Sequence, residues 1–252
     1  MTFSIAIPAR LQSTRLPGKV LADLGGKPVL KHVWETANRI KDVREVIVLT
    51  ESAEVLDAVM DWGGICYLTP ESCNSGTERI ASALDYFSGD FIFNVQSDEP
   101  FLKDKLLESM IARTLTNGAL DVLTPVYPLT DVGDILNPNV VKVVIAHGGE
   151  ALYFSRSPIP HVRGAGSDKW LSMTQFFGHM GVYLYAREIL ERVPFLPRSS
   201  LATAESLEQL QLLQAGYHIQ VIPADGPSIA IDTAEDLARA REIIRENHVD
   251  AN

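Results

Sequence analysis

Three things are scarce in this sequence: cysteine, basic residues and long apolar runs. Its 252 residues include only two cysteines, Cys66 and Cys73, too few for the disulfide framework of a secreted protein. Their spacing is not that of a C-x-x-C redox or zinc site, so we expect two ordinary thiols in a reducing compartment. No stretch approaches the ~18 apolar residues of a membrane span, and the first residues lack the basic and apolar regions of a signal peptide. The sequence therefore predicts a cytoplasmic protein with no membrane partner.

Positive charge is in deficit. The 22 lysine and arginine residues face 32 aspartate and glutamate residues, which gives a net charge of −10. A general nucleic-acid binder needs a basic face, so we expect no nucleic-acid partner. A small anion can still bind an acidic protein wherever a few Arg and Lys side chains gather. The hydrophobic content of 46% supplies a core and excludes a disordered chain.

Several familiar catalytic motifs are also missing. The sequence has no G-x-S-x-G elbow, no H-E-x-x-H helix and no catalytic cysteine context, which counts against nucleophilic or zinc-dependent hydrolysis. It has no G-x-G-x-x-G, and Gly18-Lys19 is followed by Val20 and not by the Ser or Thr of a Walker A loop.

Short apolar runs alternate with helical periodicity over the first 100 residues, which predicts right-handed βαβ units. The predicted strands are 3–7, 46–49, 65–68 and 91–95, and the predicted helices are 28–40, 53–62 and 78–87. Beyond them the pattern predicts a helix over 103–115, a strand over 120–129, a hairpin over 140–154, a strand over 180–185, one continuous helix over 201–214, a strand over 219–222 and a helix over 233–245. We expect one three-layer, Rossmann-like α/β domain with a central mixed, mostly parallel sheet and an inserted subdomain.

A basic loop, PARLQSTRLPGK, directly follows the first predicted strand and brings together Arg10, Arg15 and Lys19. Ligands of open parallel sheets bind beyond the carboxyl ends of the strands. Three converging cations repel one another unless an anion lies among them, and guanidinium groups suit bidentate contact with phosphate. The loop therefore predicts a phosphate site; the alternative is a solvated basic loop.

Two acidic segments follow other strands. Asp98 and Glu99, in NVQSDEP, are candidates to hold Mg²⁺, which prefers one or two carboxylates plus substrate phosphates; the alternative is a helix N-cap. In IDTAED, Thr233 and Asp236 are spaced as a helix-capping pair, which leaves Asp232 outside the cap as a second metal ligand. With the basic loop, these carboxylates predict metal-assisted phosphoryl or nucleotidyl transfer.

Eight segments, taken in order, resemble the motifs of the 3-deoxy-manno-octulosonate cytidylyltransferases, the CMP-Kdo synthetases of lipopolysaccharide biosynthesis. They span nearly the whole sequence: PARLQSTRLPGK (8–19), SGTER (75–79), NVQSDEP (94–100), NPNVVKVV (137–144), ALYFSRSPIP (151–160), GHMGVY (178–183), SLEQL (206–210) and IDTAEDL (231–237). So many motifs in one order are far more specific than any single one.

The resemblance implies a nucleotidyltransferase fold over one domain, residues 1–252, with a homodimer formed through the inserted subdomain. It implies a Mg²⁺-dependent transfer of CMP from CTP to the anomeric hydroxyl of 3-deoxy-D-manno-octulosonate (Kdo), with release of pyrophosphate. The catalytic residues it implies are Lys19, Asp98 and Asp232, with Asp98 and Asp232 as magnesium ligands. The implied nucleotide-binding residues are Arg10, Arg15, Lys19, Ser75, Gly76 and Thr77, and the implied sugar-binding residues are Gln96, His179, Tyr183, Glu208 and Gln209.

The sequence departs from the family pattern at four positions. Ser97 stands where the family usually has Gly, Gly178 where it has a basic residue, Gln211 where it has Arg, and Ala234 where it has Pro. Two of these changes remove a cation near the sugar-binding set, so a related 3-deoxy-ulosonic acid such as 8-amino-Kdo is an alternative substrate. Two further alternatives are a nucleotidyltransferase acting on a sugar 1-phosphate, whose first loop is usually richer in Gly, and a non-catalytic CTP-binding protein.

Overall fold

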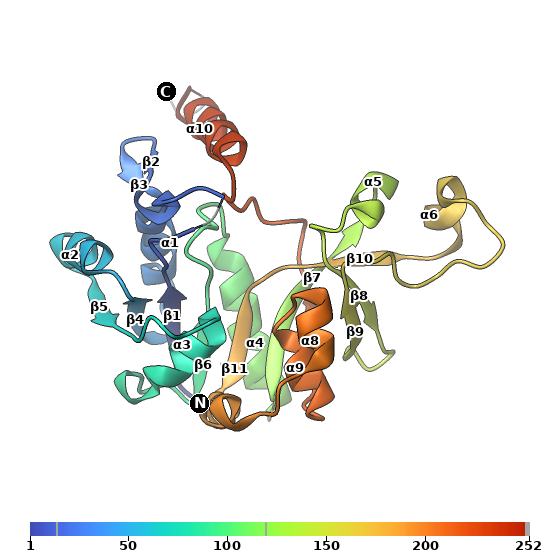
Figure 1. Cartoon of the computed structure of the whole chain (residues 1–252), viewed down its shortest axis with the longest axis horizontal. Coiled ribbons are helices and arrows are strands. Elements are labelled where there is room, and N and C mark those ends of the chain that lie inside the picture. Colours follow the sequence, from blue (N-terminus) through green and yellow to red (C-terminus); the bar gives the residue numbers. More distant parts are fainter. Residues whose placement is uncertain (14, 119, 250–252) are drawn as a thin grey trace. The chain divides into compact units, whose positions relative to one another are not determined.

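A computed structural model describes residues 1–13, 15–118 and 120–249, and the chain divides into two compact units. The first unit comprises residues 1–112 and 228–252, and the second comprises residues 113–227, so the second is inserted into the first along the chain. Figure 1 labels the helices and strands of both.

A parallel sheet forms the centre of the first unit. Its strands β1 (Phe3–Pro8), β4 (Val43–Thr50), β5 (Ile65–Leu68) and β6 (Phe91–Asn94) lie in the order β5-β4-β1-β6. Ile5 and Ile7 on the inner strand β1 are fully buried, as expected for a strand covered on both faces. All four strands were predicted from the sequence.

The remaining elements of this unit connect or follow the strands. They are η1 (Lys19–Leu21), a small antiparallel pair β2 (Asp23–Leu24) and β3 (Lys27–Pro28), α1 (Val29–Asn38), α2 (Ala53–Asp61), α3 (Gly76–Ser82), η2 (Leu84–Tyr86) and α10 (Ala234–Val249); α4 (Asp104–Asn117) continues into the second unit. Helices α1 and α2 contact β4, and α3 contacts β1. Both cysteines are free thiols, as predicted, and both are buried.

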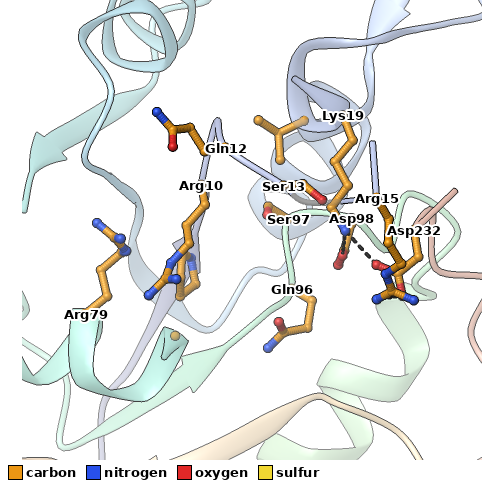
Figure 2. A pocket seen from close by; sticks show the side chains of 13 residues that line it. Arg10, Gln12, Ser13, Arg15, Lys19, Arg79, Gln96, Ser97, Asp98 and Asp232 are labelled. Atoms are coloured by element: carbon orange, nitrogen blue, oxygen red, sulfur yellow. Dashed lines mark hydrogen bonds and ion pairs between the residues drawn. The ribbon is translucent and has the colours of Figure 1, made fainter. Parts of the chain in front are cut away.

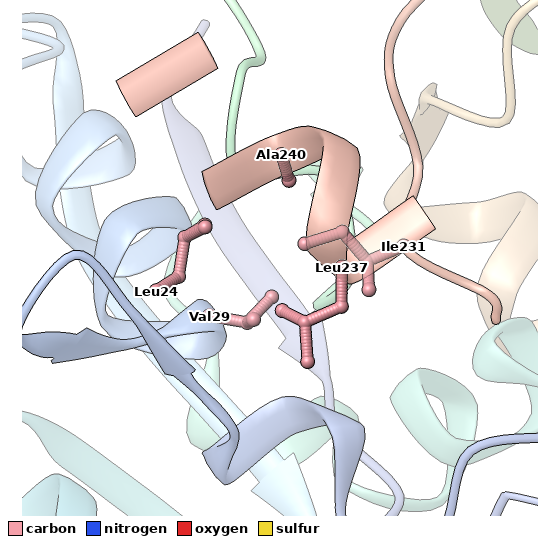
Figure 3. Close-up of a cluster of buried hydrophobic side chains, with 5 residues drawn as sticks. All are labelled: Leu24, Val29, Ile231, Leu237 and Ala240. Atoms are coloured by element: carbon pink, nitrogen blue, oxygen red, sulfur yellow. The ribbon is translucent and has the colours of Figure 1, made fainter. Parts of the chain in front are cut away.

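A hydrophobic cluster attaches helix α10 to this unit. Figure 3 shows its buried members, Leu24, Val29, Ile231, Leu237 and Ala240. Three partly buried side chains that pack against it come from segments with chemistry of their own: Leu16 from the basic loop, Phe101 from just after Asp98, and Ile244 from α10. Burial of apolar surface in one place thus joins the three chain segments that carry Lys19, Asp98 and Asp232.

Gly25 allows helix α10 to lie close to the β2–β3 turn. Its φ is +66°, and a Cβ at this position would lie 2.7 Å from Cγ2 of Ile244. A side chain here would therefore be strained by its backbone conformation and would also push α10 away.

The sheet of the second unit is mixed. Strand β7 (Val122–Leu129) is antiparallel to β10 (Phe176–His179) and β11 (Tyr183–Ala186) and parallel to β12 (Ile219–Pro223). Strand β10 is also antiparallel to β8 (Lys142–Ile145). Strands β8 and β9 (Ala151–Ser155) form the predicted hairpin. The helical elements are α5 (Val132–Leu136), η3 (Ser167–Lys169), α6 (Trp170–Met173), α7 (Arg187–Arg192), η4 (Val193–Phe195), α8 (Ser200–Glu205) and α9 (Gln209–Gln214). The predicted α/β class, with a mixed sheet flanked by helices, is confirmed.

Along the described residues, no helix combines the length and apolar character that spanning a membrane requires.

Two predicted helices are interrupted in the structure. The helix expected over 78–87 ends at Ser82 as α3 and is followed by the short 3-10 helix η2. The continuous helix expected over 201–214 is two helices, because Ser206 adopts φ +51° and ψ +50° and ends α8. Apolar residues still recur at helical spacing through this segment, so its periodicity carries no trace of the break. Strand β10, with a glycine at its centre, was not predicted.

Candidate functional site

A cleft of about 350 Å³ opens beyond the carboxyl ends of β1 and β6, entirely within the first unit. Figure 2 shows Arg10 and Arg79 on one side of it, Arg15, Lys19, Asp98 and Asp232 on the other, and Gln96 between them. The complete lining is Pro8, Arg10, Gln12, Ser13, Arg15, Lys19, Val20, Gly76, Arg79, Gln96, Ser97, Asp98 and Asp232. The predicted basic loop and both predicted acidic residues therefore meet in one place.

Lys19 lies between the two acidic side chains. Its Nζ donates to Oδ2 of Asp98 at 2.5 Å and to Oδ1 of Asp232 at 2.8 Å, while Arg15 Nη2 lies 2.9 Å from Oδ2 of Asp232. Burial lowers the pKa of Lys19, but Asp98 and then Asp232 raise it by more, so its pKa stays above the ordinary value. The ammonium group is therefore a permanent cation that offsets the repulsion between two carboxylates.

Main-chain contacts place the two carboxylates near each other. The amide of Ile231 donates to the carbonyl of Asp98 at 2.8 Å, although the two residues are far apart in sequence. The predicted capping pair is present: the amide and hydroxyl of Thr233 each donate to Oδ2 of Asp236 at 2.9 Å. Asp232 therefore lies just outside the cap with its side chain directed at Lys19, as Figure 2 shows.

The residues at this point fit a magnesium ion. Asp98 and Asp232 already converge on a single cationic group, the Lys19 ammonium, and carboxylate oxygens are the hard ligands that Mg²⁺ selects. Over the described part of the chain, no group of three or more His, Cys, Asp or Glu side chains could hold a metal. Two carboxylates leave several coordination positions for phosphate oxygens and water, which is how Mg²⁺ usually binds alongside a nucleotide.

Glu99, the other acidic candidate of this segment, is not part of the cleft lining. Its side chain is buried, and burial first, then the charges of Asp98 and Asp232, raise its pKa to about 7. Of the two neighbouring carboxylates, the structure presents Asp98 to the cleft.

Arg79 is a cleft residue to which sequence reasoning gave no role, although it ends the SGTER motif. It is 1% exposed, its Nη2 lies 3.0 Å from Oε2 of Glu51, and its Nη1 donates to the hydroxyl of Thr69. Glu51 also accepts from the amide of Leu11 at 3.1 Å and so ties the start of the basic loop to this buried arginine. Gln12 and Ser13 were missed as well; their place in the basic loop was the signal available.

The three candidates for the cytidine pocket have different environments. Gly76 lines the cleft. Ser75 caps helix α3 by accepting from the amide of Glu78 at 3.1 Å, and the buried Thr77 accepts from Nδ2 of Asn94 at 3.4 Å. Ser75 and Thr77 therefore shape the turn that presents Gly76. Arg10 is held at the entrance of the same turn, because its guanidinium donates to the carbonyl of Cys73.

The other predicted sugar-binding residues lie in the second unit. His179 Nε2 is 2.9 Å from the hydroxyl of Thr124, which itself donates to the carbonyl of Val182 at 2.8 Å. Because that hydroxyl has a single proton, Nε2 is the donor to it and Nδ1 of the neutral ring is an acceptor. Burial lowers the pKa of His179 to about 3, so the ring is uncharged near neutral pH.

Tyr183 and Gln209 are also buried within the second unit, while Glu208 starts helix α9. The ring of Tyr183 lies 5.3 Å from that of His179, centroid to centroid. Gln209 is only 2% exposed, and its Nε2 has no hydrogen-bond partner among the described residues. Buried side-chain amides are nearly always paired, so an unpaired donor at this position is unusual.

Gly178, one of the four departures from the family pattern, has a steric reason. It pairs with Tyr127 across strands β10 and β7, and a Cβ on Gly178 would lie 2.5 Å from Cζ of the Tyr127 ring. The tyrosine ring fills the space into which a basic side chain at position 178 would project.

Known proteins resemble the chain over almost its full length. The profile of a family described as "Cytidylyltransferase" matches residues 5–220. A 3-deoxy-manno-octulosonate cytidylyltransferase of Chloroherpeton thalassium is 42% identical over 242 residues, 95% of this chain and 96% of that protein. A protein of the same name from Pelobacter propionicus is 38% identical over 254 residues, 97% of this chain and 98% of that protein.

Solved structures resemble the chain as well. A CMP:2-keto-3-deoxy-manno-octonic acid synthetase complexed with CTP matches with a TM-score of 0.92 at 35% identity, over 98% of this chain and 100% of that chain. HddC from Yersinia pseudotuberculosis, at 18% identity and a TM-score of 0.69 over 97% of this chain and 100% of that chain, shares the fold.

Proposed function

The chain belongs to the 3-deoxy-manno-octulosonate cytidylyltransferases, and on this premise we propose that it transfers CMP from CTP to the anomeric hydroxyl of Kdo, with release of pyrophosphate. The observation that carries the proposal is the position of Lys19 between Asp98 and Asp232, in a cleft bordered by Arg10 and Arg15. Cations for a triphosphate and carboxylates for its metal ion lie within one pocket. The product, CMP-Kdo, serves lipopolysaccharide biosynthesis.

Arg10, Arg15 and Lys19 bind the triphosphate in this proposal. Their three positive charges line a cleft in a protein whose net charge is −10, so they form a local attraction for an anion that the rest of the surface repels. Gly76, on the turn shaped by Ser75 and Thr77, contacts the cytidine. No protein nucleophile is required, because the sugar hydroxyl attacks the α-phosphorus directly and pyrophosphate departs in line.

Asp98 and Asp232 hold Mg²⁺ in this proposal. When bound, the ion neutralises phosphate charge and favours ionisation of the attacking hydroxyl. The basic side chains have separate tasks. Lys19 keeps the two carboxylates together before the nucleotide arrives and pairs with its phosphates afterwards, and Arg15 holds the second oxygen of Asp232.

Within the second unit, His179, Tyr183, Glu208 and Gln209 contact the acceptor sugar in this proposal. Gln96, in the cleft lining of the first unit, is the remaining predicted sugar contact. Kdo offers one carboxylate and several hydroxyl groups. A neutral imidazole with an acceptor Nδ1, a buried amide donor on Gln209 and the Glu208 carboxylate supply the matching acceptors and donor. The Tyr127 ring over Gly178 favours testing related acids such as 8-amino-Kdo beside Kdo itself.

The proposal extends to the whole molecule. Residues 1–252 act as one cytidylyltransferase in the cytoplasm, and two copies associate through the inserted unit. Exposed apolar side chains in that unit support the association: Phe195 is 86% exposed, Leu152 60% and Met173 58%.

The direct test is pyrophosphate release. The purified protein is incubated with CTP, Mg²⁺ and, in turn, Kdo, 8-amino-Kdo and a sugar 1-phosphate, with ATP, GTP and UTP as nucleotide controls. Release that requires CTP, Mg²⁺ and a 3-deoxy-ulosonic acid supports the proposal. CTP binding measured by calorimetry without release for any acid overturns it in favour of a binding protein, and release with the sugar 1-phosphate alone overturns the assigned acceptor.

A further inference from the structure

The break between helices α8 and α9 is held in a disfavoured backbone conformation. Ser206, with φ +51° and ψ +50°, is the one non-glycine residue with positive φ among those the structure describes. The left-handed region is crowded for any residue that carries a Cβ, and glycine is the usual residue at such a helix end. A serine remains there only when its surroundings determine the conformation.

Arg156, the residue that follows strand β9, supplies those surroundings. Its Nε donates to the carbonyl of Glu205 at 2.7 Å and its Nη2 to the carbonyl of Ser206 at 3.2 Å. In return, the carboxylate of Glu205 accepts from the hydroxyl of Ser155 at 2.6 Å and from the amide of Arg156 at 2.9 Å. These contacts, which we call the Arg156–Glu205 clamp, hold the main-chain carbonyls on both sides of the Ser206 Cα atom.

A buried lysine holds the main chain of Arg156 in place. Lys142 is fully buried, and its Nζ donates to three main-chain carbonyls, those of Arg156 at 2.6 Å, Val140 at 2.6 Å and Asn137 at 2.9 Å. An ammonium group has three protons, so this lysine is saturated and has none for a ligand. Its contacts fix the backbone from which the Arg156 side chain extends.

The clamp sets the direction of the chain that follows it. Glu208, two residues after Ser206, is the N-cap of helix α9, and Gln209 is the first residue of that helix. The Nε2 of Gln209 is buried and has no hydrogen-bond partner among the described residues. If Ser206 relaxed to a right-handed conformation, α8 would continue and both side chains would rotate away from their present directions. A strained residue beside an unpaired buried donor is the pattern expected of a preorganised binding site.

We propose that Arg156 and Glu205 are positioning residues that hold Ser206 left-handed and thereby aim Glu208 and Gln209 at the acceptor sugar. The inference rests on the proposed function, because it takes Glu208 and Gln209 as sugar contacts. Arg156 does not touch the substrate in this scheme: its Nε and both Nη nitrogens donate to carbonyl groups, Nη1 to that of Pro138 at 3.0 Å.

The test uses Arg156→Lys, which keeps the charge but loses the planar fork that reaches several carbonyls at once. We expect the KM for the acceptor acid to rise about tenfold while the KM for CTP stays within about twofold, since only the acceptor contacts are displaced. Adding Ser206→Gly should restore most of the lost affinity, because glycine adopts the left-handed conformation without the clamp. Ser206→Ala is the matched control: it also removes the hydroxyl but keeps the Cβ, so it should not restore affinity.

Hydrogen exchange of the full-length protein gives a readout that needs no turnover. Amides of residues 206–211 should exchange faster in Arg156→Lys and return toward the wild-type rate in Arg156→Lys/Ser206→Gly. Unchanged exchange and unchanged acceptor KM in Arg156→Lys would overturn the inference, as would equal rescue by Ser206→Ala. Equal rises in both KM values together with a lower Tm would show a merely structural role. A wild-type protein that releases no pyrophosphate would reject the proposed function instead, while exchange would still decide whether the clamp holds the turn.

Discussion

Positively and negatively charged side chains form close ion pairs in the cleft. Lys19 joins Asp98 and Asp232, two carboxylates that would repel each other without it, and Arg15 adds a second cation to Asp232. In such a group, a change in charge matters more than a change in shape, because electrostatic interactions are strong where water is partly excluded.

Asp98→Asn should therefore lower kcat by about 10²-fold or more while the fold is retained, because the amide keeps the shape but loses the charge. Steady-state pyrophosphate release at saturating CTP measures the effect, and circular dichroism checks the fold. Asp104→Asn, a change at a half-buried aspartate that pairs with Arg39 outside the cleft lining, is the control and should leave kcat unchanged. Near-normal turnover by folded Asp98→Asn would remove Asp98 from the mechanism.

His179 should make stability depend on pH. Burial lowers the pKa of the folded-state imidazole from its ordinary 6.5 to about 3. Between these values the unfolded chain binds a proton that the native state does not, so the free energy of unfolding falls as pH drops from 6.5 toward 3. Urea unfolding at about pH 7.5 and pH 4.5 should show a smaller difference for His179→Gln than for the wild type. The exposed His161→Gln is the control; an equal pH response in His179→Gln would contradict the expectation.

Whole elements bring these residues together. The cluster of Leu24, Val29, Ile231, Leu237 and Ala240 fixes α10 (Figure 3). Asp232 lies in the segment just before that helix. A substitution that weakens packing in this cluster is therefore expected to weaken magnesium binding at the proposed site, although it changes no charged residue.

Leu237→Ala should destabilise the protein by about 2–5 kcal/mol, the usual range for truncating a buried leucine. It should also raise the Mg²⁺ concentration needed for half-maximal turnover, because the segment that holds Asp232 is less well fixed. Urea unfolding and magnesium titrations measure the two effects, and Leu237→Met, which nearly conserves volume, serves as the control. Loss of stability with an unchanged magnesium requirement would separate the cluster from the site.

The first unit could be predicted from the sequence because its signals are local. The four strands of its parallel sheet, the cap of Thr233 and Asp236, and the position of Asp232 just outside that cap all follow from short apolar runs and residue spacing. The helix break at Ser206, by contrast, could not be predicted from local signals. Its conformation is fixed by Arg156, 50 positions away, and nothing in the segment from 201 to 214 marks the break. The ion pair of Arg79 with Glu51 was missed for the same reason, since the two residues meet only after folding.

At the scale of the whole molecule, the proposed homodimer is open to measurement. Strand β9 lies at the edge of its sheet, and Leu152 on it is 60% exposed; an exposed apolar edge strand readily pairs with another chain. Light scattering should give twice the 27.7 kDa mass of one chain, and Leu152→Lys should shift it toward a single chain. Leu115→Lys, at a leucine that is 54% exposed on helix α4, is the control. A monomeric wild-type protein at micromolar concentration would contradict the proposal.

The insertion of one unit within the other has a consequence for biosynthesis. Asp98 is translated before residues 113–227 and Asp232 after them, and the hydrogen bond from Ile231 to Asp98 closes only when both are present. During translation, the emerging polypeptide therefore carries only one of the two proposed magnesium ligands until the ribosome has made the entire insertion. A premature stop anywhere within that insertion yields a fragment that keeps Arg10 and Arg15, the proposed phosphate contacts, but lacks Asp232.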